Sequence, residues 1–521
     1  MTGADPAPGE IAPDPPLDAF ARVHEIVDHW AGRTPAAPAV SGGGRLMRYA
    51  ELAAAGERAA AVLSGQGLRA GDRLLLVLEN GLAAAVLLLA ASRIGAWAVL
   101  VNARLTGPEI AAIRDHARPR LSFYTVGVSP EAAAHAEADG AEAAAELADL
   151  EVAWRREAGD PEPEPSDDPD PVAALLYTSG TTGAPKGVML SHGNLVFAAG
   201  RSSFVRDARR DDHSYGVLPM SHVYGLTAVL LATLYRGARV ELVPRFDPAA
   251  TARALAEDGI TVFQGVPAIY AHLLGLAKAQ GAPLAAPALR VLSSGGAPLD
   301  VALKRAVEAM FGVPLINGYG LTETSPTISV SRHEGPNDDV STGPPLPDVE
   351  TRIVSPEGPG VSNLPAGEIG ELWVRGGLVM RGYYRDPTRT AEVLTPDGWF
   401  KTGDLAQVSP AGDLIIAGRL KELIIRSGFN VYPPEVEAAI ASHPEVALTA
   451  VLGRPVPGNE EVVAFVQPRA PGALDLDDLA AHVAECLAPY KRPAEYLLRE
   501  ALPLTAAGKV RKQMLKSELE G

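Results

Sequence analysis

The chain has 521 residues, more than one ordinary hydrophobic core accommodates, so two or more domains are expected. Its content of 47% hydrophobic and 21% charged residues is typical of a soluble globular protein. The net charge of −17 argues against a nucleic-acid partner, because such a partner requires a basic face.

The single cysteine, Cys486, excludes an internal disulfide framework and a cysteine-based metal cluster. We expect it to be a buried, small apolar residue. The N-terminal residues are acidic and proline-rich, with neither the basic nor the apolar region of a secretory signal. The longest apolar run, Leu82 to Ser92, is too short to span a bilayer. We therefore predict a cytoplasmic protein without an integral membrane segment.

The first third of the chain alternates between helical and extended patterns. Residues 1–16 are predicted to be a disordered tail, because they are rich in Pro, Asp and Glu. Apolar residues then recur at helical spacing from Leu17 to Trp30. Between Tyr49 and Thr125 the alternation is typical of βαβ units around a largely parallel sheet. Helices are predicted at Glu51–Leu63, Leu82–Ile94 and Gly107–His116, and strands at Arg73–Leu78, Trp97–Val101 and Arg120–Tyr124.

The pattern changes twice further along. From Asp348 to Val374 short β segments are separated by Gly and Pro turns. A second break near Gly418 precedes a compact region of about 100 residues, the size of a small domain. We therefore expect an α/β fold with a large N-terminal domain, built of βαβ-layered subdomains and a β-rich subdomain, and a small α+β C-terminal domain. In the latter, strands are predicted at Ala447–Leu452 and Val462–Pro468, and helices at Pro434–His443 and Leu476–Leu487.

The stretch from Tyr177 to Gly187 is the most informative motif. It gathers glycines, hydroxyls and one lysine directly after an apolar segment, Val172–Leu176, that is predicted to be a strand. Glycine backbones approach a polyphosphate closely, and free amides with Ser or Thr hydroxyls bind its oxygens. The stretch lacks the Gly-Lys-Ser/Thr ending of a Walker A loop. The alternative is an ordinary flexible loop.

Further segments carry chemically suited residues. Arg290–Pro298 is predicted to be a strand that runs into a glycine turn, where open α/β sheets bind ligands. In Asn317–Thr324, Tyr319 offers a flat face to a purine and Glu323 is a hard oxygen ligand suited to Mg²⁺. Taken singly, these residues could also be a core aromatic and a solvated acid.

Together with Gly398–Leu405, Gly418–Pro433, Leu218–Gly225 and Pro503–Val510, these segments occur in the order found in adenylate-forming enzymes, and the chain resembles that superfamily over nearly its whole length. The superfamily comprises acyl-CoA synthetases, peptide-synthetase adenylation domains and luciferases. The version at Ser427–Pro433 is most similar to fatty-acyl-CoA ligases. The resemblance implies an adenylation domain at 17–418, a hinge at 419–421 and a mobile C-terminal domain at 422–521.

The resemblance also implies roles for individual residues. Lys509, Thr322, Glu323 and His222 would be catalytic, with Glu323 also binding the metal; His222 could equally be a packing histidine. Lys421 would be the hinge residue. Ser427, Gly428 and Phe429 would contact the pantetheine of coenzyme A. The expected ATP or AMP contacts are Thr178, Ser179, Gly180, Thr181, Thr182, Gly183, Lys186, Gly296, Ala297, Pro298, Asn317, Gly318, Tyr319, Gly320, Thr322, Asp404 and Arg419.

The expected acyl pocket has no charged residue, so it suits a fatty or aryl acid and argues against malonate and amino acids. Its expected members are Val223, Tyr224, Gly225, Gln264, Gly265, Gly295, Leu321 and Ile328.

The resemblance thus implies an AMP-forming acid–thiol ligase. It would use ATP and Mg²⁺ to convert a carboxylic acid to acyl-AMP, release pyrophosphate, and transfer the acyl group to coenzyme A. One alternative acceptor is a phosphopantetheinyl carrier protein acting in trans. A second alternative, of another class, is a nucleotide-binding protein without catalysis, which the presence of all the charged motif residues disfavours. The sequence leaves a homodimer open.

Overall fold

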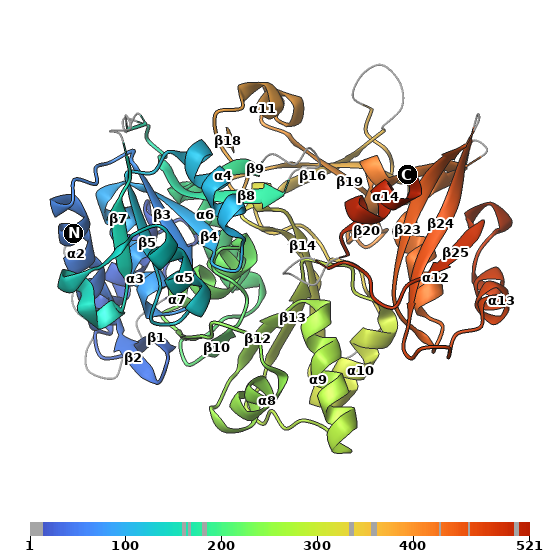
Figure 1. Cartoon of the computed structure of the whole chain (residues 1–521), viewed down its shortest axis with the longest axis horizontal. Coiled ribbons are helices and arrows are strands. Elements are labelled where there is room, and N and C mark those ends of the chain that lie inside the picture. Colours follow the sequence, from blue (N-terminus) through green and yellow to red (C-terminus); the bar gives the residue numbers. More distant parts are fainter. Residues whose placement is uncertain are drawn as a thin grey trace.

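Two eight-stranded sheets with helices packed between them form the bulk of the molecule in the computed structural model (Figure 1). The structure describes residues 14–158, 163–164, 168–179, 185–332, 338–355, 362–426, 429–456, 459–504 and 510–520. Parallel pairs predominate in the first of these sheets and form the centre of the second, and antiparallel strands lie at the edges of both. This arrangement confirms the predicted α/β fold.

The first sheet has the strand order β15-β14-β13-β12-β10-β11-β1-β2. Its strands are β1 (Pro38–Gly42), β2 (Arg45–Arg48), β10 (His213–Gly216), β11 (Arg239–Leu242), β12 (Val262–Gly265), β13 (Val291–Gly295), β14 (Leu315–Gly320) and β15 (Thr327–Val330). Helices α8 (Pro248–Glu257), α9 (Pro267–Gln280) and α10 (Val301–Phe311) connect its central strands and lie together at the bottom of Figure 1.

The second sheet has the order β18-β9-β8-β4-β3-β5-β7-β6. Its strands are β3 (Arg73–Leu78), β4 (Trp97–Asn102), β5 (Leu121–Tyr124), β6 (Glu142–Ala143), β7 (Ala153–Arg156), β8 (Val172–Ser179), β9 (Pro185–Ser191) and β18 (Gly382–Tyr383). Helices α4 (Gly107–Ala117) and α5 (Pro130–Ala138) pack on one face of this sheet in a core cluster of their own.

The layer between the sheets is built from strongly apolar helices. Helix α3 (Leu82–Ile94) is buried at every residue from Leu82 to Ser92, which explains why this run is hydrophobic on all sides. Among the described residues, no helix has the length and apolar character needed to cross a membrane. The other elements of this layer are α1 (Val23–Arg33), α2 (Tyr49–Gly65), α6 (His192–Val205), the π-helix η2 (Tyr224–Leu231) and α7 (Ala232–Tyr235).

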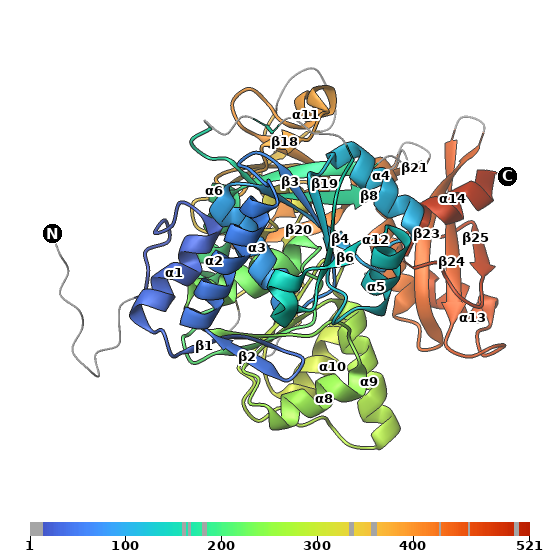
Figure 2. The same cartoon turned by 60° about the vertical axis from the view of Figure 1, so that its left-hand side comes forward.

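A four-stranded antiparallel sheet follows, and beyond it the C-terminal region forms the lobe at the right of Figure 1. The sheet contains β16 (Glu350–Val354), β17 (Gly370–Arg375), β19 (Phe400–Val408) and β20 (Leu414–Arg419), with α11 (Pro387–Val393) inserted before β19. The C-terminal elements are β21 (Ile424–Arg426), β22 (Phe429–Val431), α12 (Pro433–Ala441), β23 (Val446–Val456), β24 (Asn459–Pro468), α13 (Leu476–Cys486), β25 (Glu495–Leu498) and α14 (Lys512–Glu520). Figure 2 shows the same lobe from another side, with β23, β24 and β25 in one sheet.

One sequence-based expectation needs correction. Cys486 is exposed: it is the last residue of α13 and lies beyond the buried Leu479 and Val483 on the same helix face. Residues 14–16 of the predicted tail lie within the described part of the chain. Asp14 accepts a hydrogen bond from Arg236 at 2.7 Å, and the Pro16 carbonyl accepts one from Tyr235 at 2.5 Å.

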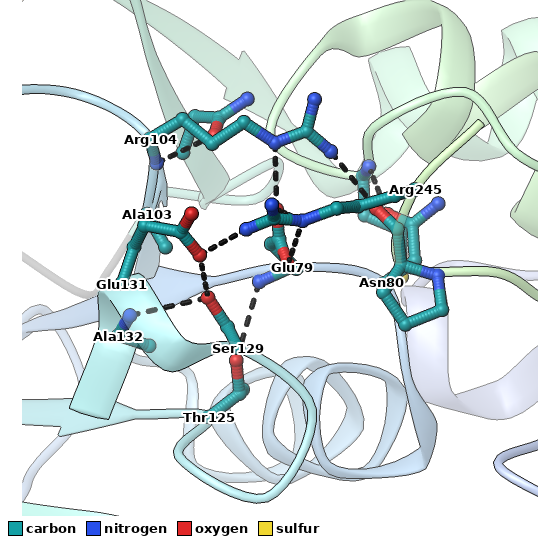
Figure 3. A network of polar contacts seen from close by, with 12 residues as sticks. Glu79, Asn80, Ala103, Arg104, Thr125, Ser129, Glu131, Ala132 and Arg245 are labelled. Atoms are coloured by element: carbon teal, nitrogen blue, oxygen red, sulfur yellow. Dashed lines mark hydrogen bonds and ion pairs between the residues drawn. The ribbon is translucent and has the colours of Figure 1, made fainter. Parts of the chain in front are cut away.

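Asn80, directly after β3, joins the two sheets. Its amide donates to the carbonyls of Gly216 and Leu218, each at 2.9 Å, and its Oδ1 accepts from the Met220 backbone amide at 2.8 Å. The carboxylate of the adjacent Glu79 forms ion pairs with Arg104 at 2.6 Å and with Arg245 at 3.3 Å (Figure 3). Asn80 therefore fixes the start of the segment that leads into η2.

Replacing Asn80 with Ala should destabilise the protein, because it strands two carbonyls and one amide in a buried site. We expect a loss of about 2–4 kcal/mol in the free energy of unfolding, measured by urea denaturation. Asn102→Ala, which removes one local bond to the Arg104 amide, is the matched control and should cost less than about 1 kcal/mol. Equal losses in the two variants would contradict the role of Asn80.

Candidate functional site

Two glycine-rich turns at the ends of adjacent parallel strands form the floor of the site. Gly295 of β13 lies beside Gly318 of β14 in the strand register. Gly296 follows with φ of +79°, in the left-handed region that favours glycine. The strand-and-turn prediction for Arg290–Pro298 is confirmed by β13. Such turns at the carboxyl ends of parallel strands are where open α/β sheets bind ligands.

A buried carboxylate lies beside this floor. Asp404 of β19 is 4% exposed, and its Oδ2 accepts a hydrogen bond from the Tyr319 hydroxyl at 2.6 Å. Its Oδ1 lies 3.3 Å from Nε of Arg419, the facing residue on β20. Burial raises the pKa of Asp404, and the charge of Arg419 offsets part of that rise. A partly desolvated carboxylate is a strong acceptor for hydroxyl groups.

A second cluster joins three separate segments. Tyr383 of β18 donates its hydroxyl to Oε1 of Glu323 at 2.9 Å, and Nζ of Lys186 lies 5.4 Å from the centre of the Tyr383 ring. Burial, together with the nearby charges of Arg389 and Lys421, lowers the pKa of Lys186, and Glu323 partly opposes that shift. The cluster presents one cation and one carboxylate side by side.

The predicted phosphate loop begins as a hairpin. Strand β8 continues past Leu176 to Ser179 and pairs with β9, so that Thr178 faces Lys186. The expected nucleotide contacts Gly180, Thr181, Thr182 and Gly183 lie outside the described residues, as do Ser427, Gly428 and Lys509.

Lys421 lies in the short helix η4 (Leu420–Glu422), directly after Arg419. The next residue, Glu422, forms an ion pair with Nζ of Lys512 in α14 at 2.8 Å. Lys512 also forms an ion pair with Glu437 of α12 at 2.8 Å. The segment after Lys421 is therefore attached to the C-terminal lobe, whereas Arg419 is paired with Asp404 of the antiparallel sheet.

Most of the expected acyl-pocket residues lie close together. A Cβ built on Gly295 would stand 3.1 Å from the Tyr224 ring, and a Cβ on Gly225 would stand 2.2 Å from the Pro219 carbonyl oxygen. The Gln264 amide donates to the Ala228 carbonyl of η2 at 2.8 Å. Val223 belongs to the same core cluster as Tyr224, and Leu321 packs against it. Gly265 ends β12, next to β13.

Other expected site residues are placed differently. Ile328 belongs to the core cluster of the antiparallel sheet, with Leu346 and Val374. His222 is exposed, and its Nδ1 accepts the Tyr224 backbone amide at 3.3 Å. The Asn317 side chain donates to the Val340 carbonyl at 2.7 Å, which makes it a support for the neighbouring loop.

The remaining expected residues border the same region. Phe429 is exposed and stacks on Tyr490 with ring centres 4.7 Å apart. Thr322 opens the short helix η3 (Thr322–Thr324). Gly320, Ala297 and Pro298 lie in or after the two turns, and none of them is fully buried.

Two residues at the site were not foreseen. Tyr383 belongs to no recognised motif, and only its place in the structure shows that it lies between Lys186 and Glu323. Arg206, the residue after α6, is buried beside Tyr224 although its helix carries no motif. Both depend on contacts between segments distant in sequence.

Comparison with known proteins agrees with this geometry. The family described as AMP-binding enzyme matches residues 27–384. The chain belongs to this family. The C-terminal domain of AMP-binding enzymes matches residues 435–509. The expected superfamily, its acyl-CoA synthetase branch and the enzyme class of acid–thiol ligase are confirmed.

Similar members are CoA ligases. A feruloyl-CoA synthase of Amycolatopsis is 36% identical over 485 residues, which cover 92% of this chain and 96% of the relative. A long-chain-fatty-acid–CoA ligase of Bacillus subtilis is 39% identical over 362 residues, 68% of this chain and 64% of the relative. The O-succinylbenzoate–CoA synthetase of Bacillus subtilis, solved with ATP and a magnesium ion, is 28% identical with a TM-score of 0.79, covering 94% of this chain and 99% of that one.

For an AMP-binding enzyme, the raised pKa of Asp404 predicts a pH-dependent affinity for adenosine. A raised pKa means that the carboxylate takes up its proton at a higher pH than an exposed aspartate does. Affinity should therefore fall as the pH is lowered from about 7.5 to about 5. Asp404→Asn should weaken binding about 30-fold at the higher pH and remove that dependence.

Titration calorimetry with adenosine measures this directly, because adenosine has no phosphate that titrates in the range. Asp397→Asn, at an exposed position near the same sheet, is the control and should bind like the wild type. An unchanged pH dependence in Asp404→Asn would show that this carboxylate does not bind the ribose hydroxyls of adenosine.

Proposed function

We propose that the chain converts a carboxylic acid and ATP to acyl-AMP and pyrophosphate, and then transfers the acyl group to the thiol of coenzyme A. The observation that carries this proposal is that the Asp404–Tyr319–Arg419 cluster and the Glu323–Tyr383–Lys186 cluster flank one glycine-rich floor. One cluster suits a ribose and the other a polyphosphate. The CoA ligases among the relatives support the same chemistry.

The first half-reaction needs positioned charges more than covalent help from the protein. The substrate carboxylate attacks the α-phosphorus, and the bond to pyrophosphate breaks. Lys186, with the Thr178–Gly183 loop, would bind the departing pyrophosphate, and Thr322 the α-phosphate. Lys509 would neutralise the oxygens at which charge builds up. Positioned charges of this kind often supply the largest catalytic contribution.

Glu323 fits a magnesium site of the sparse kind. Among the described residues there is no group of three acidic, histidine or cysteine side chains that could hold a metal ion alone. Mg²⁺ commonly takes one or two carboxylates and completes its shell with phosphate oxygens and water. A bound Mg²⁺ would neutralise phosphate charge. Tyr383 orients the carboxylate for this role, because its hydroxyl occupies only one oxygen of Glu323.

The second half-reaction would use another placement of the C-terminal lobe. Arg419 is paired with the adenylation domain, whereas Glu422 is tied to the lobe through Lys512, so Lys421 lies where the two attachments meet. We assign residues 17–418 to the adenylation domain, 419–421 to the hinge and 422–521 to the C-terminal domain. Rotation about Lys421 would withdraw Lys509 and bring Ser427, Gly428 and Phe429 to the thiol.

The body of the substrate should be apolar. Tyr224, Gly295 and Val223 form a buried surface against which an alkyl chain or a ring can pack. The named substrates of the relatives include feruloyl and long-chain fatty acyl groups. An aryl or fatty acid is therefore the proposed substrate class.

A phosphopantetheinyl carrier protein is the second candidate acceptor. The exposed Phe429, stacked on Tyr490, would suit pantetheine whether coenzyme A or a carrier protein bears it. Comparing coenzyme A with a phosphopantetheinylated carrier protein as acceptor separates the two.

Lys509→Ala should separate the two half-reactions. Acid-dependent pyrophosphate release should fall by about 100-fold or more, because the charge at the reacting oxygens is lost. Thioester formation from supplied acyl-AMP and coenzyme A should be retained. Lys516→Ala, on the exposed face of α14, is the control and should leave both steps intact. Equal loss of both steps in Lys509→Ala would refute the assignment.

A further inference from the structure

Arg206 is a buried cation beside Tyr224 and Gln264, two of the expected acyl-pocket residues. It directly follows the last residue of α6, and only 6% of it is exposed. Its Nη1 donates to the Ser202 carbonyl at 3.3 Å, and its guanidinium interacts with the Tyr224 hydroxyl. Nε has no hydrogen-bond partner among the described residues. Burial lowers the pKa of Arg206, but an arginine keeps its charge in a protein.

Other buried arginines of the chain are compensated more completely. Arg73 donates to three backbone carbonyls, those of Ala117, Gly71 and Arg118. Arg201, also on α6, forms ion pairs with two aspartates, each at 2.8 Å. In the described part of the chain no carboxylate forms an ion pair with Arg206. A buried charge without a counter-charge destabilises the protein, so we expect an anionic group to bind beside this arginine.

The guanidinium faces the predicted substrate surface. A Cβ built on Gly318 would lie 3.6 Å from Nη2 of Arg206, and Gly318 is itself partly exposed. Because position 318 is a glycine, no side chain separates Nη2 from the space in front of β14. Gly295 lies beside Gly318, and a Cβ built on Gly295 would stand 3.1 Å from the Tyr224 ring. One wall of the pocket thus combines two bare backbone positions, an aromatic ring and a cation.

The enclosed space beside Arg206 is too small for a ligand. A cavity of about 20 Å³ lies there, lined by Arg206, Gln264, Ser202 and Asp212 among others. That volume holds about one water molecule, which could bind Gln264 Oε1, an atom that has no hydrogen-bond partner in the described part of the chain. Asp212 on this wall pairs with Arg290. Any anion that compensates Arg206 must therefore approach from the Gly295–Gly318 side, where the substrate is proposed to bind.

The geometry points to Arg206 as a specificity-determining residue that binds a second anionic group, such as a carboxylate, at the end of the substrate remote from the reacting carboxyl. This inference rests on the proposed function and narrows its substrate class to acids with an apolar body and an anionic far end. It revises the expectation of an uncharged pocket, which considered only the residues of the recognised motifs. A plain alkyl end would leave the buried cation uncompensated, whereas a carboxylate forms a charge-assisted pair with it.

The test compares acids of matched shape with wild-type enzyme. Adipate is paired with 6-methylheptanoate, and 4-carboxycinnamate with 4-isopropylcinnamate, so that an isopropyl group replaces the far carboxylate. Longer homologues extend the alkyl pair. The measurement is kcat/KM for acid-dependent pyrophosphate release at saturating ATP. The expected result is a preference of at least about 10-fold for the diacid in one or more pairs.

Arg206→Met should remove that preference. We expect kcat/KM for the preferred diacid to fall on the order of 100-fold through KM, with the isopropyl acid unchanged or improved. The KM for ATP should not change, which shows that the site is intact. Arg206→Lys should keep part of the preference, because it keeps the charge. Arg209→Met, at a side chain that is 57% exposed, is the matched control and should behave like the wild type.

Three results would overturn the inference. The wild type could prefer the isopropyl acid in every pair, or Arg206→Met could weaken both acids of a pair equally, as a purely structural arginine would. A preference for 4-hydroxycinnamate over 4-carboxycinnamate would assign the site to a neutral acceptor instead. Because the comparison of acids uses wild-type enzyme, it stands even where a variant fails to fold. Pyrophosphate release with no acid at all would refute the proposed function as well.

Discussion

The buried carboxylate of Asp404 is the contact on which the arrangement of the site depends. It joins β19 to Tyr319 of the large sheet through a short hydrogen bond and to Arg419 of β20 through an ion pair. Tyr319 of β14 is thereby held against the β19–β20 hairpin, and Arg419 of this hairpin stands two residues before Lys421. The cost of burying the charge appears as a raised pKa, and the two partners offset part of it. A nucleotide that replaced water at this carboxylate would therefore be bound at the junction between the large domain and the C-terminal lobe.

The second requirement is close approach of backbone to ligand. Gly225 has no room for a side chain, because a Cβ would meet the Pro219 carbonyl oxygen at 2.2 Å. Gly295 and Gly318 are neighbours across two strands and leave the pocket wall without side chains. Such bare positions let a substrate reach groups that a side chain would otherwise cover, and Arg206 is one of them. The same glycines that admit the substrate would thus also determine which substrate is recognised.

Helices and strands with a strong hydrophobic pattern were predictable from the sequence, whereas contacts between these elements were not. The bounds of α3 and β3 agree with the sequence prediction, because a continuous apolar run bounded by Gly and Asp leaves little choice. Lys186 and Glu323 were both expected at the site from separate motifs. Two residues, Arg206 and the Tyr383 that lies between Lys186 and Glu323, were missed. Neither hydrophobic periodicity nor motif spacing predicts which helix end contacts which strand. The exposure of Cys486 was missed for a related reason: it depends on how far along α13 the packed core extends.

The central claim is that this chain forms an acyl-adenylate before any thiol takes part. ATP–pyrophosphate exchange without coenzyme A, measured across aryl, fatty and dicarboxylic acids, tests it most directly. The account predicts exchange that requires ATP, Mg²⁺ and at least one of these acids, and that needs no thiol. Exchange that appears only when coenzyme A is added, or no exchange with any acid by protein that binds adenosine, would contradict it.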